Sequence, residues 1–402
     1  MRVLVFSWEY PPVIEGGLGR HVRKLSERLV SAGVEVHVLT RGAGQLPALE
    51  SRHGVHVHRV TEPPFPRDVE QFLRWVKRMN QDMAKLGSEL SQTFEFDLVH
   101  SHDWLVAEAA ECAARSTGLP WLVTVHATEY GRHQGWVQKH PQAKIHGAER
   151  RMTRRADHVI TCSDYMAGHV AQIFGVAAER IATIPNGIDT ADLVAPPEPE
   201  LARLRARFAK PDERLVLMVG RLVHEKGFHL ALDALAPIVR RRGGRVRFVI
   251  AGTGTAKAEL KAQARQLRLT SYGSFIGWAG DDLLHSLYRV ADLCIVPSIY
   301  EPFGLVALEA MASGCLCVVA DTGGLREVVP AGGTAGLRFP SNDADALRRI
   351  LLRMLTDDDA RAQLIAEARE HVLQFDWTEV ARRTIGVYHA LTARQPALPR
   401  KV

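Results

Sequence analysis

The chain has 402 residues, of which 46% are hydrophobic and 24% charged, a composition typical of a globular protein and not of a disordered or fibrous one. No apolar run reaches the length of a transmembrane helix. The formal net charge of +6 suits an anionic ligand, a membrane surface or nucleic acid and does not choose among them. The basic residues are dispersed, which argues against nucleic-acid binding. Five scattered cysteines predict reduced thiols and a cytoplasmic location.

Short apolar runs alternate with helix-period segments along the whole chain, which predicts parallel sheets with helical crossovers. The first of these runs, Val3–Ser7, is typical of a buried strand and not of a signal peptide. Further strands are expected in the first half at Glu35–Thr40, Val55–Val60, Asp97–Ser101, Trp121–His126, Asp157–Cys162 and Arg180–Ile184. In the second half they are expected at Leu215–Val219, Arg247–Ala251, Ser274–Gly277, Leu293–Pro297, Leu316–Ala320 and Gly336–Phe339.

Turn and breaker residues separate the two arrays of strands. Asn186-Gly187 is a turn signal, and Pro196-Pro197-Glu198-Pro199 can continue neither a helix nor a strand. We therefore expect two doubly wound, Rossmann-like α/β domains in residues 1–190 and 191–374, followed by a last amphipathic helix in 375–402. Ligands of such sheets bind beyond the carboxyl ends of the strands, so the residues that follow each strand are the candidates for function.

A glycine-rich segment, Gly16-Gly17-Leu18-Gly19, follows the first strand and precedes a helix expected from about Arg20. A glycine such as Gly17 lets the backbone approach a diphosphate and direct amide groups at it. A plain tight turn is an equally good interpretation of this short pattern.

Two basic residues follow the first strand of the second array. Arg221 and Lys226 lie in the segment Gly220–Gly227, and two fixed cations there can neutralise a diphosphate leaving group as its charge develops. The competing interpretation is a solvated loop with surface charges, which fits Arg221 poorly because it comes directly after a strand.

The most specific segment runs from Pro297 to Glu309. A helix is expected from about Phe303, and its first amide groups can bind a phosphate. Glu301 can accept hydrogen bonds from sugar hydroxyls, and Glu309, two turns further, can hold a ribose. The residues assigned to the nucleotide sugar in this segment are Tyr300, Glu301, Phe303, Gly304, Leu305 and Glu309.

Polar and aromatic residues also follow two strands of the first array. His102, Asp103 and Trp104 are suited to recognising a polyhydroxylated acceptor, and His126 follows the next strand. A metal could be held by His100, His102, Asp103 and His126, but no recognised ligand spacing is present, so no metal is assigned. The acidic run Asp357–Asp359 precedes a helix and is interpreted as its N-terminal cap.

In their order along nearly the whole chain, these motifs resemble those of glycosyltransferase family 4, including bacterial and archaeal glycogen synthases. The resemblance is carried by Gly16–Gly19, His102–Trp104, His126, Pro185-Asn186-Gly187-Ile188-Asp189, Gly220-Arg221-Leu222 with Lys226-Gly227, Glu301 and Glu309. Within the family the chain is most similar to actinobacterial α-1,4-glucosyltransferases of glycogen or methylglucose polysaccharide synthesis, through Trp8–Pro12 and His126–Glu129.

The resemblance implies a GT-B fold, in which two Rossmann-like domains face each other across a cleft and the last helix crosses back to the first domain. It implies retaining transfer of a hexose, here glucose, from a nucleotide diphosphate sugar to a carbohydrate acceptor, without a metal or other cofactor. The implied roles are Arg221 and Lys226 on the diphosphate, Glu301 on the donor sugar, Glu309 on the ribose and His126 near the reacting carbon. Glu15 stands close to where starch and glycogen synthases carry a lysine, which leaves the nucleotide open.

Three alternatives stay open from the sequence. A transferase of the same family could act on a lipid or small-molecule acceptor. A lipid acceptor would need a docking face, which the segment Phe72–Leu86 could supply. A sugar-nucleotide epimerase or a non-catalytic nucleotide-sugar-binding protein would also suit the fold. The base, the donor sugar, the acceptor and the oligomeric state are not determined.

Overall fold

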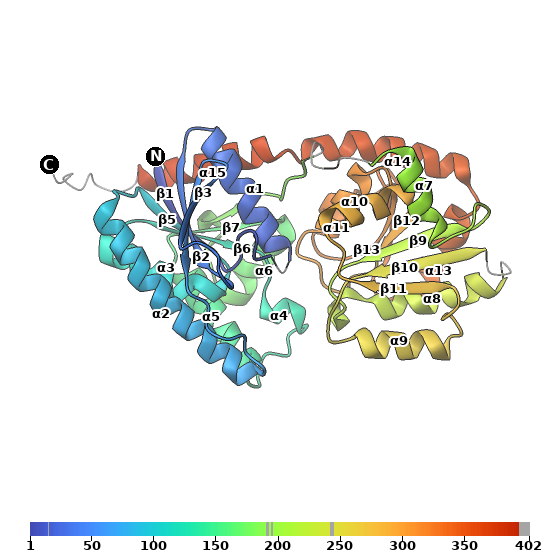
Figure 1. Ribbon diagram of the computed structural model, residues 1–402, viewed down its shortest axis with the longest axis horizontal. Coiled ribbons are helices and arrows are strands. Elements are labelled where there is room, and N and C mark those ends of the chain that lie inside the picture. The colour runs from blue at the N-terminus through green and yellow to red at the C-terminus, as the bar shows by residue number, and fades with distance from the viewer. Residues whose placement is uncertain (15, 190–192, 194–195, 242–244, 394–402) are drawn as a thin grey trace. The chain divides into compact units, whose positions relative to one another are not determined.

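The computed structural model describes residues 1–14, 16–189, 193, 196–241 and 245–393 (Figure 1). Its contacts divide the chain into two compact units: unit 1 is Met1–Gly187 together with the chain from Asp376, and unit 2 is Ile188–Phe375. The junction expected at 190/191 falls on residues outside the described ones, as does Glu15. The last helix belongs to unit 1, although it is the most distant element in the sequence.

Unit 1 is built on an eight-stranded sheet with the order β3-β4-β2-β1-β5-β6-β7-β8. All neighbouring strands are parallel except β3 and β4. The strands are β1 (Arg2–Phe6), β2 (Glu35–Arg41), β3 (Leu49–Arg52), β4 (Val55–Val60), β5 (Leu98–His102), β6 (Trp121–Val125), β7 (His158–Thr161) and β8 (Ile181–Thr183). The sequence did not predict β3, a four-residue edge strand whose side chains are largely exposed and carry no apolar alternation.

The helices of unit 1 connect these strands and cover the sheet. They are α1 (Gly17–Ser31), α2 (Val69–Thr93), α3 (Ala107–Thr117), α4 (Glu129–Arg132), α5 (Gln142–Arg155), α6 (Asp164–Phe174) and α15 (Trp377–Thr392). Helices α1 and α15 share one core with the strands, in which Leu25 and Tyr388 pack against residues such as Val36. Helix α1 begins at Gly17, three residues before the expected start at Arg20, with Gly16 as its N-cap.

Unit 2 is built on a six-stranded parallel sheet with the order β11-β10-β9-β12-β13-β14. The strands are β9 (Arg214–Val219), β10 (Val246–Ala251), β11 (Gly273–Gly277), β12 (Leu293–Val296), β13 (Leu316–Asp321) and β14 (Leu337–Pro340). Each strand expected in this half is present, with ends that differ by a few residues.

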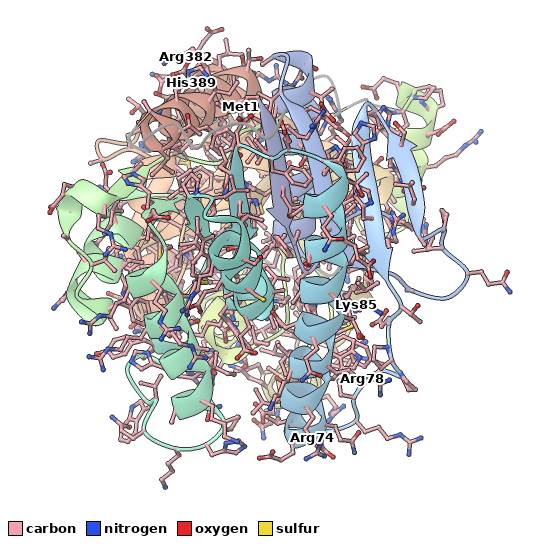
Figure 2. The ribbon with its side chains drawn as sticks, turned by 90° about the vertical axis from the view of Figure 1, so that its left-hand side faces the viewer. Met1, Arg74, Arg78, Lys85, Arg382 and His389 are labelled. Atoms are coloured by element: carbon pink, nitrogen blue, oxygen red, sulfur yellow. The ribbon has the colours of Figure 1, made fainter. Side chains whose placement is uncertain are left out.

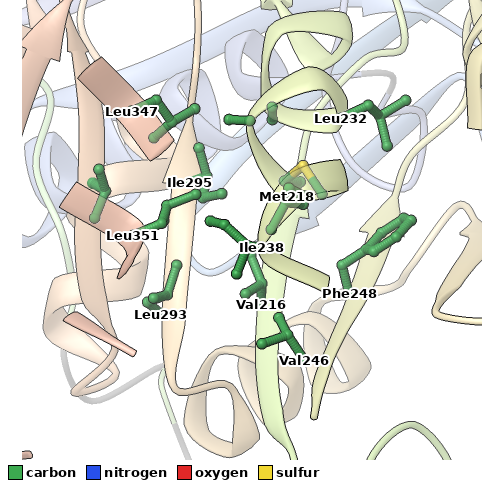
Figure 3. Packing of buried hydrophobic residues seen from close by; sticks show 14 of the residues in the cluster. Val216, Met218, Leu232, Ile238, Val246, Phe248, Leu293, Ile295, Leu347 and Leu351 are labelled. Atoms are coloured by element: carbon green, nitrogen blue, oxygen red, sulfur yellow. The ribbon is translucent and has the colours of Figure 1, made fainter. Parts of the chain in front are cut away.

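The helices of unit 2 are α7 (Glu198–Ala206), α8 (Phe228–Arg241), α9 (Lys257–Gln266), α10 (Asp281–Val290), α11 (Leu305–Ala312), α12 (Leu325–Val328), α13 (Ala344–Met354) and α14 (Asp358–His371). In the core, Leu232 and Ile238 of α8 and Leu351 of α13 pack on Val216 and Ile295 of the sheet (Figure 3). The fold class expected from the sequence, two doubly wound α/β units, is confirmed.

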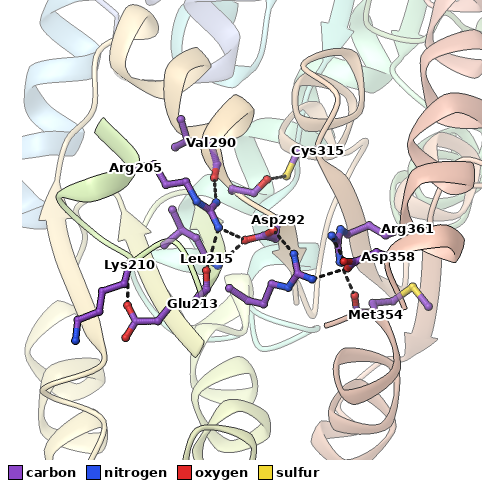
Figure 4. A network of polar contacts seen from close by, with 12 residues as sticks. Arg205, Lys210, Glu213, Leu215, Val290, Asp292, Cys315, Met354, Asp358 and Arg361 are labelled. Carbon is purple, nitrogen blue, oxygen red and sulfur yellow. Dashed lines mark hydrogen bonds and ion pairs between the residues drawn. The ribbon is translucent and has the colours of Figure 1, made fainter. Parts of the chain in front are cut away.

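A network of hydrogen bonds and ion pairs lies at the amino-terminal ends of the strands in unit 2 (Figure 4). The Asp292 carboxylate, just before β12, accepts hydrogen bonds from Arg205 at 2.9 Å and from Arg214 at 3.1 Å. Arg214 also pairs with Asp358 of the acidic run. Asp357 Oδ1 accepts from the Ala360 amide at 3.0 Å, which confirms the helix cap expected there.

Helix α2 contains the segment considered for membrane docking. Its apolar residues Trp75 and Met79 are buried, whereas Arg74, Arg78 and Lys85 are exposed and project outward (Figure 2). The helix therefore packs its apolar side into unit 1. In the described part of the chain, we find no helix with the length and apolar character of a membrane span.

Candidate active site

In unit 2, the loop after β9 is joined to the loop after β12. The Ile299 amide donates to the Glu225 carbonyl at 2.8 Å. Gly227 has a φ of +67°, and a Cβ at this position would lie 1.9 Å from the Pro297 carbonyl oxygen. Only glycine permits this approach. The approach brings Lys226 beside the segment that carries Glu301.

Lys226 and Glu301 form an ion pair, with Lys226 Nζ 2.6 Å from Glu301 Oε2. The Ser298 hydroxyl donates to the same carboxylate oxygen at 3.1 Å. Both charged side chains are largely buried, with exposed fractions of 20% and 12%. The cation expected on the diphosphate and the carboxylate expected on the sugar are therefore in direct contact.

Arg221 lies in the same loop but is much more accessible, since 54% of its side chain is exposed. One of its guanidinium nitrogens lies 3.6 Å from Glu225 Oε1. The loop thus holds two cations of different character: one buried against a carboxylate, and one exposed enough to reach a ligand.

Helix α11 begins at Leu305 and not at Phe303, which corrects the expected helix start. Gly304 is the N-cap, with a φ of +120°, and its carbonyl accepts from Leu308. Phe303 is buried, and its ring packs edge-on against Phe375 at 6.0 Å. The first-turn amides, which have no preceding helical carbonyl as acceptor, are therefore those of Leu305, Val306 and Ala307.

Glu309 and Tyr300 are both buried in unit 2. Glu309 Oε2 accepts a hydrogen bond from the Tyr288 hydroxyl at 3.1 Å. Tyr288 comes from α10 and fixes the direction of the carboxylate. The sequence interpretation missed Tyr288, because a buried tyrosine on an amphipathic helix is normally read as a core residue.

In unit 1, the start of α1 already has an acidic partner. The Gly16 amide donates to Glu9 Oε2 at 3.0 Å. Gly17, the first helical residue, is exposed. The assignment of Gly17 to the nucleotide sugar stays a prediction, and the Glu9 carboxylate beside the helix start is a negative charge that any phosphate there would meet.

The structure brings His102, Asp103 and His126 together. His102 Nδ1 and His126 Nε2 share a hydrogen bond of 3.0 Å, and Asp103 Oδ1 accepts from the His126 amide at 2.7 Å. Burial raises the pKa of Asp103 to about 6 and lowers the pKa of His126 to about 4. His102 is almost fully buried and Asp103 is bound to backbone, so in this structure both orient His126.

Trp104, the third residue assigned to the acceptor, is half-buried, and its ring packs against Phe72 at 6.4 Å. Acceptor binding by His102, Asp103 and Trp104 stays a prediction.

A further histidine joins this group. His21 of α1 lies with its ring centroid 4.6 Å from that of His126, and its Nδ1 forms a 2.8 Å hydrogen bond with Asn186 Oδ1. Gly187 follows, where a Cβ would lie 2.7 Å from the ring of Trp377. Asn186 therefore orients the ring of His21, and the lack of a side chain at Gly187 leaves room for Trp377, the first residue of α15. The sequence predicted a turn at Asn186-Gly187, but no pattern in it marked His21 as a candidate.

The chain matches two family models, "Glycosyltransferase Family 4" over residues 15–192 and "Glycosyl transferases group 1" over residues 202–371. It is 39% identical to a glycogen synthase of Mycobacterium tuberculosis, over 99% of this chain and 98% of that protein. It is 31% identical to a D-inositol 3-phosphate glycosyltransferase of Xylanimonas cellulosilytica, over 95% of this chain and 93% of that protein.

Among solved structures, sucrose-phosphate synthase from Thermosynechococcus elongatus superposes with a TM-score of 0.83 at 25% identity. The alignment covers 98% of this chain and 100% of that one. Other chains of this fold were solved in complex with UDP-glucose and with ADP.

Proposed function

Because this chain belongs to the glycosyltransferases of family 4 and group 1, we propose that it transfers glucose from a nucleotide diphosphate sugar to a carbohydrate acceptor. The product is an α-1,4-glucan of the glycogen or methylglucose polysaccharide type, formed with retention of the anomeric configuration. The full-length likeness to a glycogen synthase supports this choice of donor sugar and acceptor.

The observation that carries the proposal is the cluster of chemically matched groups at the carboxyl edge of the sheet in unit 2. Lys226 and Arg221 follow β9, and Glu301 follows β12. The first-turn amides of α11 come shortly after Glu301 in the chain, since α11 is the helix that follows β12. Cations and helix amides suit a diphosphate, and buried carboxylates suit sugar hydroxyls. A structural role alone would not require two carboxylates, Glu301 and Glu309, next to an apolar strand.

In the proposed reaction, the bond between the anomeric carbon and the diphosphate oxygen breaks on the face where the acceptor oxygen attacks. Lys226, Arg221 and the amides of α11 stabilise the negative charge that develops on the leaving phosphate. The departing phosphate oxygen takes the proton of the acceptor hydroxyl. Glu301 binds the sugar, Glu309 binds the ribose, and His126 of unit 1 contacts the transferred sugar.

These cations can neutralise the leaving group without a metal, so we propose that turnover is metal-independent and uses no cofactor beyond the donor. Acceptor recognition is assigned to His102, Asp103 and Trp104 of unit 1. The cytoplasmic location inferred from the cysteines also stays a proposal.

A turnover screen tests the function directly. Purified protein is incubated with ADP-, UDP- and GDP-glucose and each of three acceptors: α-1,4-glucan oligomers, inositol phosphate and lipid-linked sugars. Elongation of the glucan by one or more α-linked glucose units is expected. A reaction that consumes the donor without any acceptor would instead indicate an epimerase or hydrolase.

The second candidate is transfer to a small or lipid acceptor. It is favoured by the full-length likeness to the D-inositol 3-phosphate glycosyltransferase. Product formation on inositol phosphate, with no elongation of glucan in the same screen, would replace the first proposal by this one.

A further inference from the structure

Three histidines from three different elements of unit 1 converge at one place. His21 comes from α1, His102 is the last residue of β5, and His126 follows β6. One ring nitrogen of each lies within 4.8 Å of those of the other two. The ring centroids of His102 and His126 are 5.3 Å apart, and those of His21 and His102 are 5.5 Å apart.

His21 supplies a ring nitrogen that lacks a partner. Its Nδ1 faces the Asn186 carboxamide oxygen at 2.8 Å, so Nδ1 carries the proton and donates it. Its Nε2 therefore holds a lone pair, and this buried atom has no hydrogen-bond partner among the described residues. The whole residue is only 5% exposed. A buried, unsatisfied acceptor beside two further imidazoles requires an explanation.

All three rings are neutral over the physiological pH range. Burial lowers the pKa of His126 to about 4 and the pKa of His102 well below its usual range. Burial, with the charge of a protonated His126 next in size, lowers the pKa of His21 in the same way. A neutral imidazole nitrogen is a ligand for a borderline transition-metal ion.

We propose that His21, His102 and His126 form a three-nitrogen site for a divalent transition-metal ion such as Zn²⁺. Three protein ligands leave one coordination position open, as in many tetrahedral zinc sites. The 3.0 Å between His102 Nδ1 and His126 Nε2 is close to the ~3.3 Å that two nitrogens span when each lies about 2.0 Å from one tetrahedral ion. Binding of the ion breaks the hydrogen bond between these two rings, and the ring that donated it carries its proton on its other nitrogen, so that both facing nitrogens bind the ion through their lone pairs.

The surroundings fit this role. Asn186 binds the other ring nitrogen of His21, the kind of contact that fixes the orientation of a metal-ligating histidine. Magnesium is not the expected ion, since it prefers oxygen ligands and all three ligands here are nitrogens. The sequence could not reveal this set, because His21 lies in a helix far from His102 and His126 in the chain and no ligand spacing connects them.

A second group of possible ligands in unit 1, Glu35, His37 and His56, provides a matched comparison. Its carboxylate is already paired with Arg2 at 2.7 Å, and both ring nitrogens of His37 are hydrogen-bonded, to Glu35 and to His58. We therefore expect this group to bind the ion far less tightly than His21, His102 and His126.

The site has a consequence for turnover that rests on the proposed function. If His126 contacts the transferred sugar, an ion bound to its Nε2 makes this nitrogen unavailable to the sugar and reorients the ring. Zn²⁺ then inhibits an enzyme whose chemistry needs no metal. Binding of the ion, by contrast, does not depend on any assumed activity.

The test uses the full-length protein, freed of metal by a chelator and then titrated with Co²⁺, which gives visible absorption bands when bound by nitrogen ligands. One equivalent of Co²⁺ should bind and be displaced by one equivalent of Zn²⁺. His21→Gln should weaken Co²⁺ binding by about 100-fold or more, since losing even a residue that only orients a ligand costs about 10- to 100-fold. The control His56→Gln should bind like the wild type. Circular dichroism and a thermal melt verify that each variant is folded.

If His21→Gln does not fold, His126→Gln serves in its place, because His126 is less buried than His21. The proposal is overturned if the wild type shows no one-to-one Co²⁺ complex, or if only His56→Gln loses it.

Donor turnover is measured across the same Zn²⁺ titration. Loss of activity at the concentration that fills the site supports the inhibitory role, and unchanged activity with the site filled overturns that role. A protein that binds Co²⁺ one-to-one but elongates no acceptor would refute the proposed function and leave the site intact.

Discussion

Lys226 Nζ lies 2.6 Å from Glu301 Oε2, so the cation assigned to the leaving group and the carboxylate assigned to the sugar form one largely buried ion pair. Removing either partner leaves the other charge unpaired at a largely buried position. The two residues therefore act as a coupled pair, and substitutions at them should not be additive.

Replacing Lys226 should remove the main charge that stabilises the leaving diphosphate. Lys226→Ala is expected to lower kcat by about 100-fold or more, the usual effect of losing one stabilising donor. Lys210→Ala, which removes an exposed lysine before β9, is the control and should keep wild-type kinetics. Arg221→Ala should also lower kcat. Wild-type turnover in both the Lys226 and Arg221 variants would exclude their role on the leaving group.

The coupling itself can be measured. Because each single substitution strands the other charge, the double variant Lys226→Ala/Glu301→Ala should lose less activity than the two single losses multiplied together. Steady-state kinetics on the four proteins of this cycle decide the point. Losses that multiply without interaction would mean that the ion pair does not persist in solution.

Glu301 and Glu309 should fail in different ways. Glu301→Ala should lower kcat and kcat/KM together, because its contacts with the sugar strengthen as the ring flattens in the transition state. Glu309→Ala should act mainly through the KM for the donor, since the ribose is remote from the breaking bond. Tyr288→Phe, which removes the 3.1 Å hydrogen bond to Glu309, should produce a smaller shift in the same direction. The reverse pattern would exchange the roles of the two carboxylates.

Turnover should be unaffected by prolonged treatment with EDTA, because the leaving group is stabilised by side-chain cations and helix amides. The measurement compares initial rates before and after treatment, with Mg²⁺ and Mn²⁺ added back in parallel. Activity that disappears and returns only with one of these ions would contradict the proposed mechanism.

Glu149 of α5 should make the stability of unit 1 depend on pH. Burial raises its pKa to about 8, against the opposing effects of a hydrogen bond from the Glu129 amide and the charge of Arg132. A carboxyl group whose folded-state pKa is raised stabilises the fold below its unfolded-state pKa of about 4.3, and this contribution is lost as the pH rises through 8.

The free energy of unfolding of the wild type, measured relative to Glu149→Gln, should therefore fall by up to about 1.4 kcal/mol per pH unit between pH 5 and 8. Denaturant titrations at four pH values measure this difference. Glu89→Gln, at an exposed position of α2, is the control, and its free energy of unfolding should change with pH as that of the wild type does. If the free energy of unfolding of Glu149→Gln also changes with pH as that of the wild type does, the carboxyl group is not buried as described.

The sequence alone determined the architecture and much of the candidate donor site. Alternating apolar runs and helical segments are local patterns, and strands such as β9 and β12 follow from them because a buried parallel strand is apolar along its whole length. Residues in the loops after strands, such as Lys226 and Glu301, become candidates from the sequence because ligands of parallel sheets bind beyond the carboxyl ends of the strands.

Contacts between residues distant in the chain were decided by the tertiary structure. Lys226 and Glu301 meet because Gly227 fits against Pro297, and Tyr288 reaches Glu309 from another helix. His21 of α1 lies beside His102 and His126, which come from β5 and the segment after β6. Asn186 hydrogen-bonds to His21, and the next residue, Gly187, packs against Trp377 of α15. No local pattern encodes such pairs, because burial and packing depend on what the rest of the chain places around each residue.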